Sequence, residues 1–362
     1  MKLLFLGDFF FDYNAFPPDF EAICRFVQDN AYSVILNLET SWGTQGKPVS
    51  KRGVHLRSSD LLIEALKKLN VVAVCLANNH AMDFGAESLQ SLCEQLTQAG
   101  IIYVGAGKNL TEALRPVHLS GTHYWLQNFA WELEEAVRAT SYSAGTAPLN
   151  RKLILSQTQR LKTDKPQSRI INIYHWGFEY NLLPMPLDIQ FAHDSLDAGA
   201  DLIIGHHPHV IQPQQTYRGK QIFYSLGNFY FGSRRSHFKK IFKHHTPQNA
   251  CDFGIGVVLD TDKDSVTHLI ALRYDKSCDC SVIKQVQPME LQDLTHTDWT
   301  SNRYYQEAKR QSVNFTPVLT TNSLSNYIKL KWLSLLYTAA KILGPLRKKG
   351  PFRLVAERMK NR

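Results

Sequence analysis

Residues 197–213 read DAGADLIIGHHPHVIQP, and this stretch indicates the class of fold. A helix is predicted over 187–198, and the apolar run 202–204 after it is typical of a short strand covered on both faces. The strand ends in Gly205, after which three histidines surround one proline. Because the sites of open α/β sheets form where strands end and loops begin, these histidines are expected in a functional site.

The same alternation of strand and helix recurs through the first two-thirds of the chain. Strands are expected over 2–6, 33–38, 71–76, 101–104, 170–174, 202–204 and 221–224, and helices over 20–30, 61–69, 87–99, 151–162 and 187–198. The weakly patterned segment 133–150 is expected to form a loop or lid. From Gly254 onward, short alternating segments at 255–259, 267–274 and 282–286 predict antiparallel strands. The fold class expected is therefore α/β, with helices on the faces of a sheet that ends in an antiparallel part.

The composition is that of a chain that buries a substantial core. The sequence has 362 residues, 44% apolar and 20% charged, which excludes disorder as its main state. The net charge is +9, from 41 Lys and Arg against 32 Asp and Glu, and residues 326–362 hold ten of the basic residues and one acid. The remainder is balanced at 31 of each sign. Because the body is neutral and lacks a nucleic-acid-binding motif, no nucleic-acid partner is expected.

The first residues and the cysteines bear on location. The opening MKLLFLGDFF lacks the long apolar region of a signal peptide and favours a buried first strand. The six cysteines are scattered, and Cys278 and Cys280 form a C-x-C without the second pair of a zinc knuckle. A cytoplasmic location is expected, with peripheral attachment at the inner face of the membrane as a further hypothesis.

Two basic segments have open interpretations. A helix is expected over 325–343, too short and too charged to span a bilayer, and a basic stretch follows at 347–350. It could dock on the domain as an ordinary terminal helix, or bind a membrane surface or a biosynthetic complex as a basic amphipathic tail. The basic segment 234–245 could recruit an anionic substrate or form a solvated loop.

Potential metal ligands follow five of the predicted strands. They are Asp8, Glu39, Asn78, Asn79, His80, His175, His206, His207 and His209, with Asp83 and Glu179 a few residues beyond two of these strand ends. Taken singly, such residues can be caps, turn residues or buried core histidines. Taken together, they bring oxygen and imidazole ligands to one sheet edge, a set that suits Mn, Fe or Zn. Their number exceeds what one tetrahedral ion needs, and two divalent ions sharing a carboxylate would use it fully.

Five strings of residues carry a family resemblance. They are NLET (37–40), ANNHAMDFG (77–85), HWGFEY (175–180), DAGADLIIGHHPHVIQP (197–213) and YSLGNF (224–229). They resemble the CapA family, bacterial capsule and poly-γ-glutamate synthesis proteins of the calcineurin-like metallophosphoesterase superfamily, over about residues 1–260. The resemblance implies a four-layer α/β/β/α sandwich of the metallophosphoesterase type with a dinuclear site at the strand ends. We expect this domain to span 1–290, followed by a C-terminal helical extension with the basic tail at 291–362.

The resemblance also implies roles for individual residues. Asp8 would bind one metal, and Glu39 would be the carboxylate that bridges the two metals. Asn79 and His175 would bind the second metal, and His207 and His209 would supply imidazoles to the pair. His80 would be the catalytic histidine. His206 or Asn78 could take the role of the assigned residue that adjoins it in the sequence. The sequence departs from the superfamily pattern in two places, because Phe10 stands where a histidine is usual and Asn37-Leu38-Glu39 replaces a Gly-Asp motif. A single tightly bound ion is therefore a second possibility.

Two functions follow as hypotheses. The first is a metal-dependent hydrolase of cell-envelope polymer metabolism, in which a metal-bound hydroxide attacks a phosphoester or amide-type bond and His80 assists. Its substrate would be an anionic polymer or a phosphorylated compound. The second is a non-catalytic accessory protein of a capsule or polyglutamate assembly complex, in which the site binds the polymer without turnover.

Overall fold

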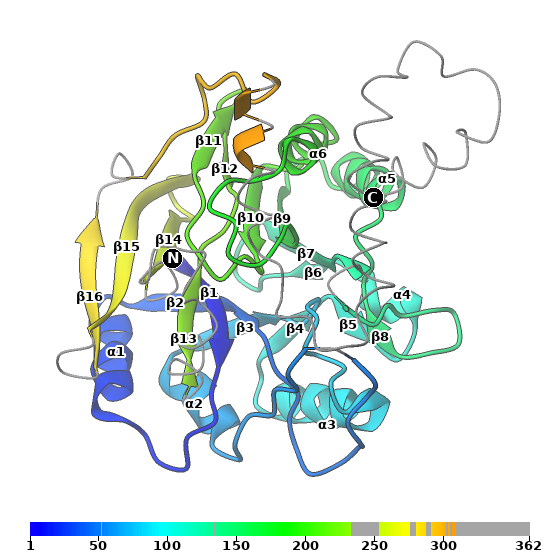
Figure 1. Cartoon of the computed structure of the whole chain (residues 1–362), viewed down its shortest axis with the longest axis vertical. Helices are drawn as coiled ribbons and strands as arrows, with labels where there is room; N and C mark the ends of the chain where they lie inside the picture. The colour runs from blue at the N-terminus through cyan, green and yellow to red at the C-terminus, as the bar shows by residue number, and fades with distance from the viewer. Residues whose placement is uncertain are drawn as a thin grey trace.

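The structure is a computed structural model that describes residues 1–308 except 52, 133–134, 233–252, 276–279, 287–290, 302 and 305. In this part of the chain, two large sheets pack face to face and helices cover the outer face of each (Figure 1). The four-layer α/β/β/α sandwich expected from the sequence is therefore confirmed. The tail at 326–362, the basic segment 234–245 and Cys278 lie outside the described residues.

The first sheet contains the N-terminal strands and the antiparallel part. Its order is β16-β15-β14-β1-β2-β3-β4, and β13 also pairs with β1. Strands β1 to β4 run parallel, whereas β14 to β16 are antiparallel, as the alternating segments predicted. The bounds are β1 Lys2–Phe10, β2 Tyr32–Leu38, β3 Val71–Cys75, β4 Ile102–Val104, β13 Asn228–Phe231, β14 Phe253–Asp260, β15 Ser265–Asp275 and β16 Cys280–Val286.

The second sheet is built from the middle of the chain. Its order is β11-β12-β10-β9-β7-β6, in which β7, β9, β10 and β12 run parallel. A small two-stranded sheet joins β5 to β8. The bounds are β5 Ala106–Gly107, β6 Val117–His118, β7 Tyr124–Ala130, β8 Gly145–Thr146, β9 Arg169–His175, β10 Leu202–His206, β11 Gln214–Tyr217 and β12 Lys220–Phe223.

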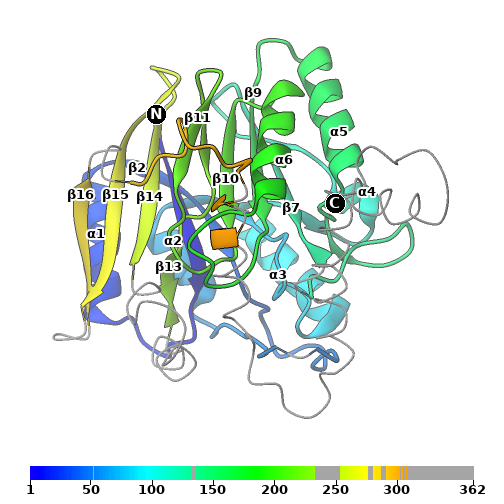
Figure 2. The same cartoon turned by 45° about the horizontal axis from the view of Figure 1, so that its top comes forward.

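Side-chain alternation along the strands divides the core into layers. On β1, Leu3 and Phe5 pack between the two sheets, whereas Leu4 and Leu6 pack against helices of the first sheet. Those helices are α1 (Pro18–Asp29), α2 (Leu62–Lys68) and α3 (Gly85–Gln98). The second sheet carries α5 (Arg151–Asp164) and α6 (Pro186–Asp197) side by side on its outer face (Figure 2). The short α4 (Leu110–Ala113) lies beside β5 and β8.

Two segments are more closely packed than the sequence suggested. Within 133–150, expected to be a loop or lid, β8 pairs with β5, and Ala147 is buried in the core beside α5. The chain after residue 290 also returns to the second sheet, where Leu294 is buried and its backbone N donates to the carbonyl of Gln214. The division of the chain at residue 290 stays a prediction.

No helix in the described residues is both long enough and apolar enough to cross a bilayer. The cellular compartment stays a prediction.

Gly205, which precedes the three histidines, marks a close approach between β10 and its neighbours. A Cβ at this position would stand 1.9 Å from the Tyr224 carbonyl oxygen and 2.6 Å from Trp176 Nε1. We expect Gly205→Ala to lower the free energy of unfolding by about 1–3 kcal/mol or more, because backbone must move. Urea unfolding measures this loss, and Gly53→Ala is the control, since its nearest contact would be 3.5 Å. Equal stability of the two variants would contradict the tight packing.

Candidate metal centre

A bulge in β1 turns Asp8 toward the space between the sheets. Phe5 faces that space, and strict alternation would place Asp8 on the opposite, helix-covered side. The pairing of β1 with β2 shifts between Leu6 and Asp8, which makes Gly7 an extra residue. The shift reverses the alternation, as bulges do beside functional sites. Asp8 Oδ1 therefore accepts a hydrogen bond of 2.8 Å from Asn37 Nδ2 on β2.

Regular alternation brings the other strand-end ligands to the same space. On β9, Ile173 packs between the sheets and His175 follows two residues later. At the end of β2, Glu39 likewise follows Asn37 by two residues and therefore lies on the same side of the sheet. The carboxyl ends of parallel strands from both sheets thus meet, with Asp8 and Glu39 from the first sheet facing His175 from the second, where the sequence had suggested the edge of a single sheet.

His207 and His209 lie on a loop with an unusual backbone. Their φ angles are +95° and +55°, a region that costs a non-glycine residue about 1–3 kcal/mol. The segment after β9 holds this loop, because Tyr180 N donates to the Pro208 carbonyl at 2.7 Å. The Tyr180 ring also stacks on His209, with centroids 6.0 Å apart. Tertiary contacts therefore impose the conformation that directs both imidazoles into the site.

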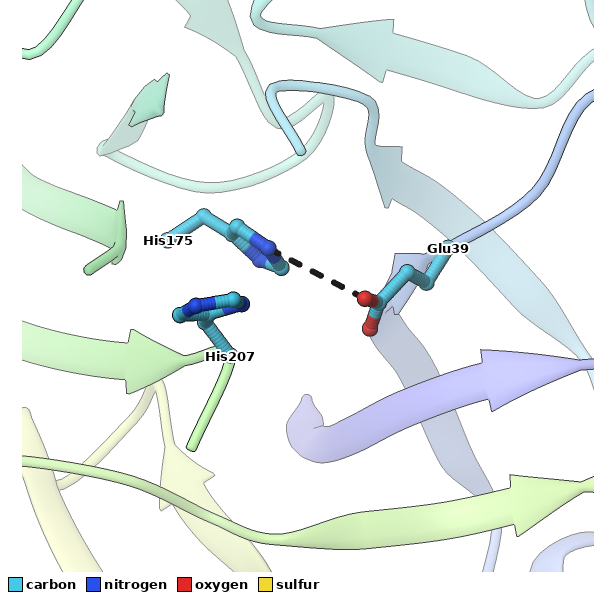
Figure 3. A group of neighbouring side chains, drawn as sticks. All are labelled: Glu39, His175 and His207. Carbon is cyan, nitrogen blue, oxygen red and sulfur yellow. Dashed lines mark ion pairs between the residues drawn. The ribbon is translucent and has the colours of Figure 1, made fainter. Parts of the chain in front are cut away.

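Three groups of described side chains could hold a metal ion, each with ligand atoms within 4.8 Å of one another. They are Glu39, His175 and His207; Asp8, Glu39 and His209; and Glu179, His207 and His209. Figure 3 shows the first group, whose side chains approach a common space from different elements. Asn79 adds an amide oxygen to it, 3.2 Å from His175 Nε2. Glu39 belongs to the first two groups, which is the position of a bridging carboxylate.

The surroundings of Glu39 fit a cation. Its side chain is fully buried, and Oε1 has no hydrogen-bond partner among the described residues. Oε1 lies 3.5 Å from His209 Nε2 and 3.9 Å from the Nε2 atoms of His80 and His175. Burial, together with the nearby charge of Asp8, raises the pKa of Glu39 well above its ordinary value. An ion among these atoms would offset the cost of burying the carboxylate.

His209 connects the two buried carboxylates. Its Nδ1 lies 3.2 Å from Asp8 Oδ2 and 2.9 Å from Asn228 Oδ1, while Nε2 faces Glu39. Burial alone would lower the pKa of His209, but the charges of Glu39 and Asp8 outweigh it and raise this pKa to about 10. A proton on the imidazole thus supplies the positive charge that the two carboxylates require. A divalent ion supplies the same charge, and its binding would release the proton.

His80 lies beside these ligands and is oriented by Asp83. Its Nδ1 lies 2.7 Å from Asp83 Oδ2, and its Nε2 points toward Glu39. Burial lowers the pKa of His80 to about 4, although the hydrogen bond that the ring makes to Asp83 opposes this shift. The imidazole is therefore neutral at neutral pH, with the Nδ1 proton donated to Asp83 and a lone pair on Nε2 toward the site.

A buried lysine completes the environment of His80. Lys51, whose side chain is 5% exposed, forms an ion pair with Asp83. Its Nζ also donates to the Asn79 carbonyl at 3.2 Å and lies 3.0 Å from His80 Nδ1. Lys51 therefore joins the segment before α2 to the turn that carries Asn79 and His80.

The structure brings together the seven residues to which the family resemblance gives a role. Asp8, Glu39, Asn79, His80, His175, His207 and His209 all line the candidate site. Asn78 instead holds the turn, because its amide binds the Leu38 carbonyl and the backbone N atoms of His80 and Ala81. His206 Nδ1 lies 3.4 Å from Asp8 Oδ1 and remains beside the groups rather than in one.

Sequence reasoning assigned no role to three neighbouring residues. Asn37 and Asn228 had a signal, since both lie inside strings that carry the family resemblance. Lys51 had none, because it sits in an unpatterned loop 28 residues before Asn79, and only the tertiary structure brings the two into contact.

The candidate metal centre thus lies between the two sheets of a four-layer sandwich. A model of the bacterial capsule synthesis protein family PGA_cap matches residues 2–233, and the chain belongs to this family. A capsule biosynthesis protein CapA of Bacillus anthracis is 32% identical over 205 residues, 55% of this chain and 50% of the relative. The PGA biosynthesis protein CapA of Bacillus subtilis is 31% identical over 201 residues, 54% and 52% of the two chains.

A probable polyglutamine synthesis accessory protein of Mycobacterium tuberculosis is 32% identical over 205 residues, 54% of each chain. The chain thus spans about half the length of the curated relatives it matches. Among solved structures, a hypothetical protein from Thermus thermophilus has a TM-score of 0.45 at 15% identity, covering 79% of this chain and 99% of that one. A 5'-nucleotidase precursor from the same organism has a TM-score of 0.41 at 11% identity, covering 86% and 58%.

Proposed function

We propose that this chain is a metal-dependent hydrolase, which cleaves a phosphoester or amide-type bond in capsule, poly-γ-glutamate or related cell-envelope polymer metabolism. The observation that carries the proposal is the position of Glu39. Two ligand groups share this buried carboxylate, and the Nε2 atom of His80 faces it from 3.9 Å. Membership of the capsule synthesis family supports the metabolic setting.

The cofactor in this proposal is a pair of divalent ions, with Mn, Fe and Zn as the candidates that match oxygen and imidazole ligands. Asp8, Glu39 and His209 would hold one ion. Glu39, Asn79, His175 and His207 would hold the other. When bound, such ions polarise an oxygen of the substrate and make water acidic enough to be a nucleophile at neutral pH.

His80 moves the proton in this scheme. Because Asp83 accepts a hydrogen bond from Nδ1, Nε2 carries the lone pair and can take a proton from a donor in the site. The imidazolium formed would be stabilised by the Asp83 carboxylate, and it can return the proton to the leaving group. Asn37 holds Asp8 and Glu39 in place, since its Nδ2 donates to both carboxylates at 2.8 and 3.3 Å.

The substrate we propose is an anionic polymer or a phosphorylated compound. The second candidate function is an accessory role, favoured by the word accessory in the name of the mycobacterial relative. In that case the site binds the polymer without cleaving it. A membrane surface or a biosynthetic complex is the partner proposed for the basic tail.

Hydrolysis is tested with His80→Ala in the full chain loaded with Mn²⁺. We expect the rate on a generic phosphodiester and on poly-γ-glutamate to fall by roughly 10²–10⁴-fold, because a positioned proton-transfer group is lost. Metal content by elemental analysis should stay that of the parent, since His80 belongs to none of the ligand groups. The control is His118→Ala, an exposed histidine on β6.

The outcomes separate the two functions. A slow His80→Ala variant with full metal content supports the hydrolase. A parent chain that binds metal but cleaves neither substrate favours the accessory role, and a His80→Ala variant as fast as the parent contradicts the assignment of His80.

A further inference from the structure

Glu179 is an acidic residue at the metal centre that the scheme above leaves without a role. It lies on the segment after β9, and a carboxylate oxygen of Glu179 lies within 4.8 Å of a nitrogen of His207 and of His209. Unlike the other members of the three groups, Glu179 is only half-buried.

The backbone on both sides of Glu179 is held in place. Phe178 packs edge-on against Trp131, with ring centroids 5.3 Å apart. Tyr180 is anchored to the histidine loop by its backbone hydrogen bond to Pro208 and by its stacking on His209. The contacts of its two neighbours therefore hold the backbone at Glu179, whose side chain is only half-buried.

The two ion positions differ in the number of ligands that the other residues supply. The group of Glu39, His175 and His207 gains a fourth donor from Asn79. The group of Asp8, Glu39 and His209 has three members, with His206 Nδ1 beside it, 3.4 Å from Asp8 Oδ1. The residue two positions after Asp8 cannot add a ligand, because Phe10 packs in an apolar cluster with Leu56 and Phe231. The Phe231 ring in turn lies 5.1 Å from that of His209.

We propose that Glu179 is a further metal ligand, which binds the ion held by Asp8, Glu39 and His209 from the solvent side of the site. Two ligands of one ion stand up to about 4.4 Å apart, since each bond is about 2.0–2.2 Å long. The Glu179 carboxylate lies within 4.8 Å of a His209 nitrogen, so a small rotation of the side chain would bring it into that range. The inference rests on the metal centre of the proposed function, but not on hydrolysis.

The test is metal binding by the full chain after removal of metal with a chelator. Calorimetric titration with Mn²⁺ is expected to show that Glu179→Gln weakens one of the two binding steps by at least the roughly 10–100-fold typical of lost metal-site partners. Glu179→Asp, which keeps the carboxylate, should lose less. The matched control is Glu21→Gln, which removes another incompletely buried glutamate, on α1.

Replacing the bound metal by Co²⁺ gives a second measurement, the visible absorption spectrum, which a general loss of stability would not change. The visible absorption of bound Co²⁺ depends on the number and type of its ligands. We expect its bands to change in Glu179→Gln and to stay unchanged in Glu21→Gln. Circular dichroism of the metal-free variants checks that both are folded.

The results distinguish this inference from the proposed function. A Glu179→Gln variant with the affinity and cobalt spectrum of the parent overturns the ligand assignment, even if its hydrolysis is slow. A parent chain that binds no metal overturns both proposals. If the parent binds metal without hydrolysing either substrate, and Glu179→Gln binds metal more weakly than the parent, Glu179 is still a ligand and only the hydrolase proposal is contradicted.

Discussion

Glu39→Gln is expected to release both ions, the largest effect that a single substitution should have on the site. Glu39 is the residue common to the groups with Asp8 and with His175, so its loss removes a ligand from each. A neutral amide also removes the charge that would attract divalent ions into a buried site. We expect metal affinity to fall by more than the roughly 10–100-fold seen for outer partners of metal ligands. Elemental analysis after dialysis against Mn²⁺ measures the ions retained per chain.

The same substitution is expected to leave the metal-free fold intact. Burial raises the pKa of Glu39, so an uncharged amide of the same shape avoids the cost of an ionised carboxylate there. The metal-free variant should therefore unfold at no lower urea concentration than the metal-free parent. The control is Asp8→Asn, which affects one group only and should retain about one ion. If Glu39→Gln retained both ions, Glu39 would not be a ligand that the two ions share.

Lys51→Met is expected to cause the largest loss of stability. The Lys51 and Asp83 side chains are 5% and 1% exposed, and the substitution leaves the Asp83 carboxylate buried without its cation. Breaking a buried ion pair from one side costs about 3–5 kcal/mol, because an uncompensated charge remains. Urea unfolding of the metal-free chain measures this loss separately from metal binding.

Two comparisons make this result specific. Lys68→Met removes the pair with Glu21, whose side chains are 36% and 40% exposed, and an exposed pair of this kind is worth about 0–1 kcal/mol. Combining Lys51→Met with Asp83→Asn removes both charges and should recover part of the lost stability. If Lys51→Met were no less stable than Lys68→Met, the buried pair would not hold the turn around His80.

The order of elements was predictable because the signals for strands and helices are local. Runs such as 71–76 and 202–204 are continuous and apolar, and they are strands β3 and β10 in the structure. The short strands β5, β8, β11 and β13 were missed. β11 (Gln214–Tyr217) is largely polar, and β13 (Asn228–Phe231) is a strand because it pairs with β1, more than two hundred residues away.

The residues of the candidate site were predictable for a different reason. Parallel strands that share a sheet end at the same edge, so the polar residues after β1, β2 and β3 had to meet, as had those after β9 and β10. The sequence placed all of them at the edge of one sheet, whereas the structure brings together the edges of two packed sheets. Which face each side chain takes was not predictable at Asp8, because the bulge at Gly7 depends on the register between β1 and β2. Periodicity alone would have turned this carboxylate away from the others.

The sequence by itself determined the alternation of elements, the family and the set of ligand types, because these depend on the identity and spacing of nearby residues. Only the tertiary structure decided that Glu39 is shared by two groups, that Lys51 lies against His80, and that Glu179 faces His207 and His209. Each of these contacts joins residues far apart in the chain. The positive φ angles of His207 and His209 likewise exist only because the packed segment around Tyr180 holds them.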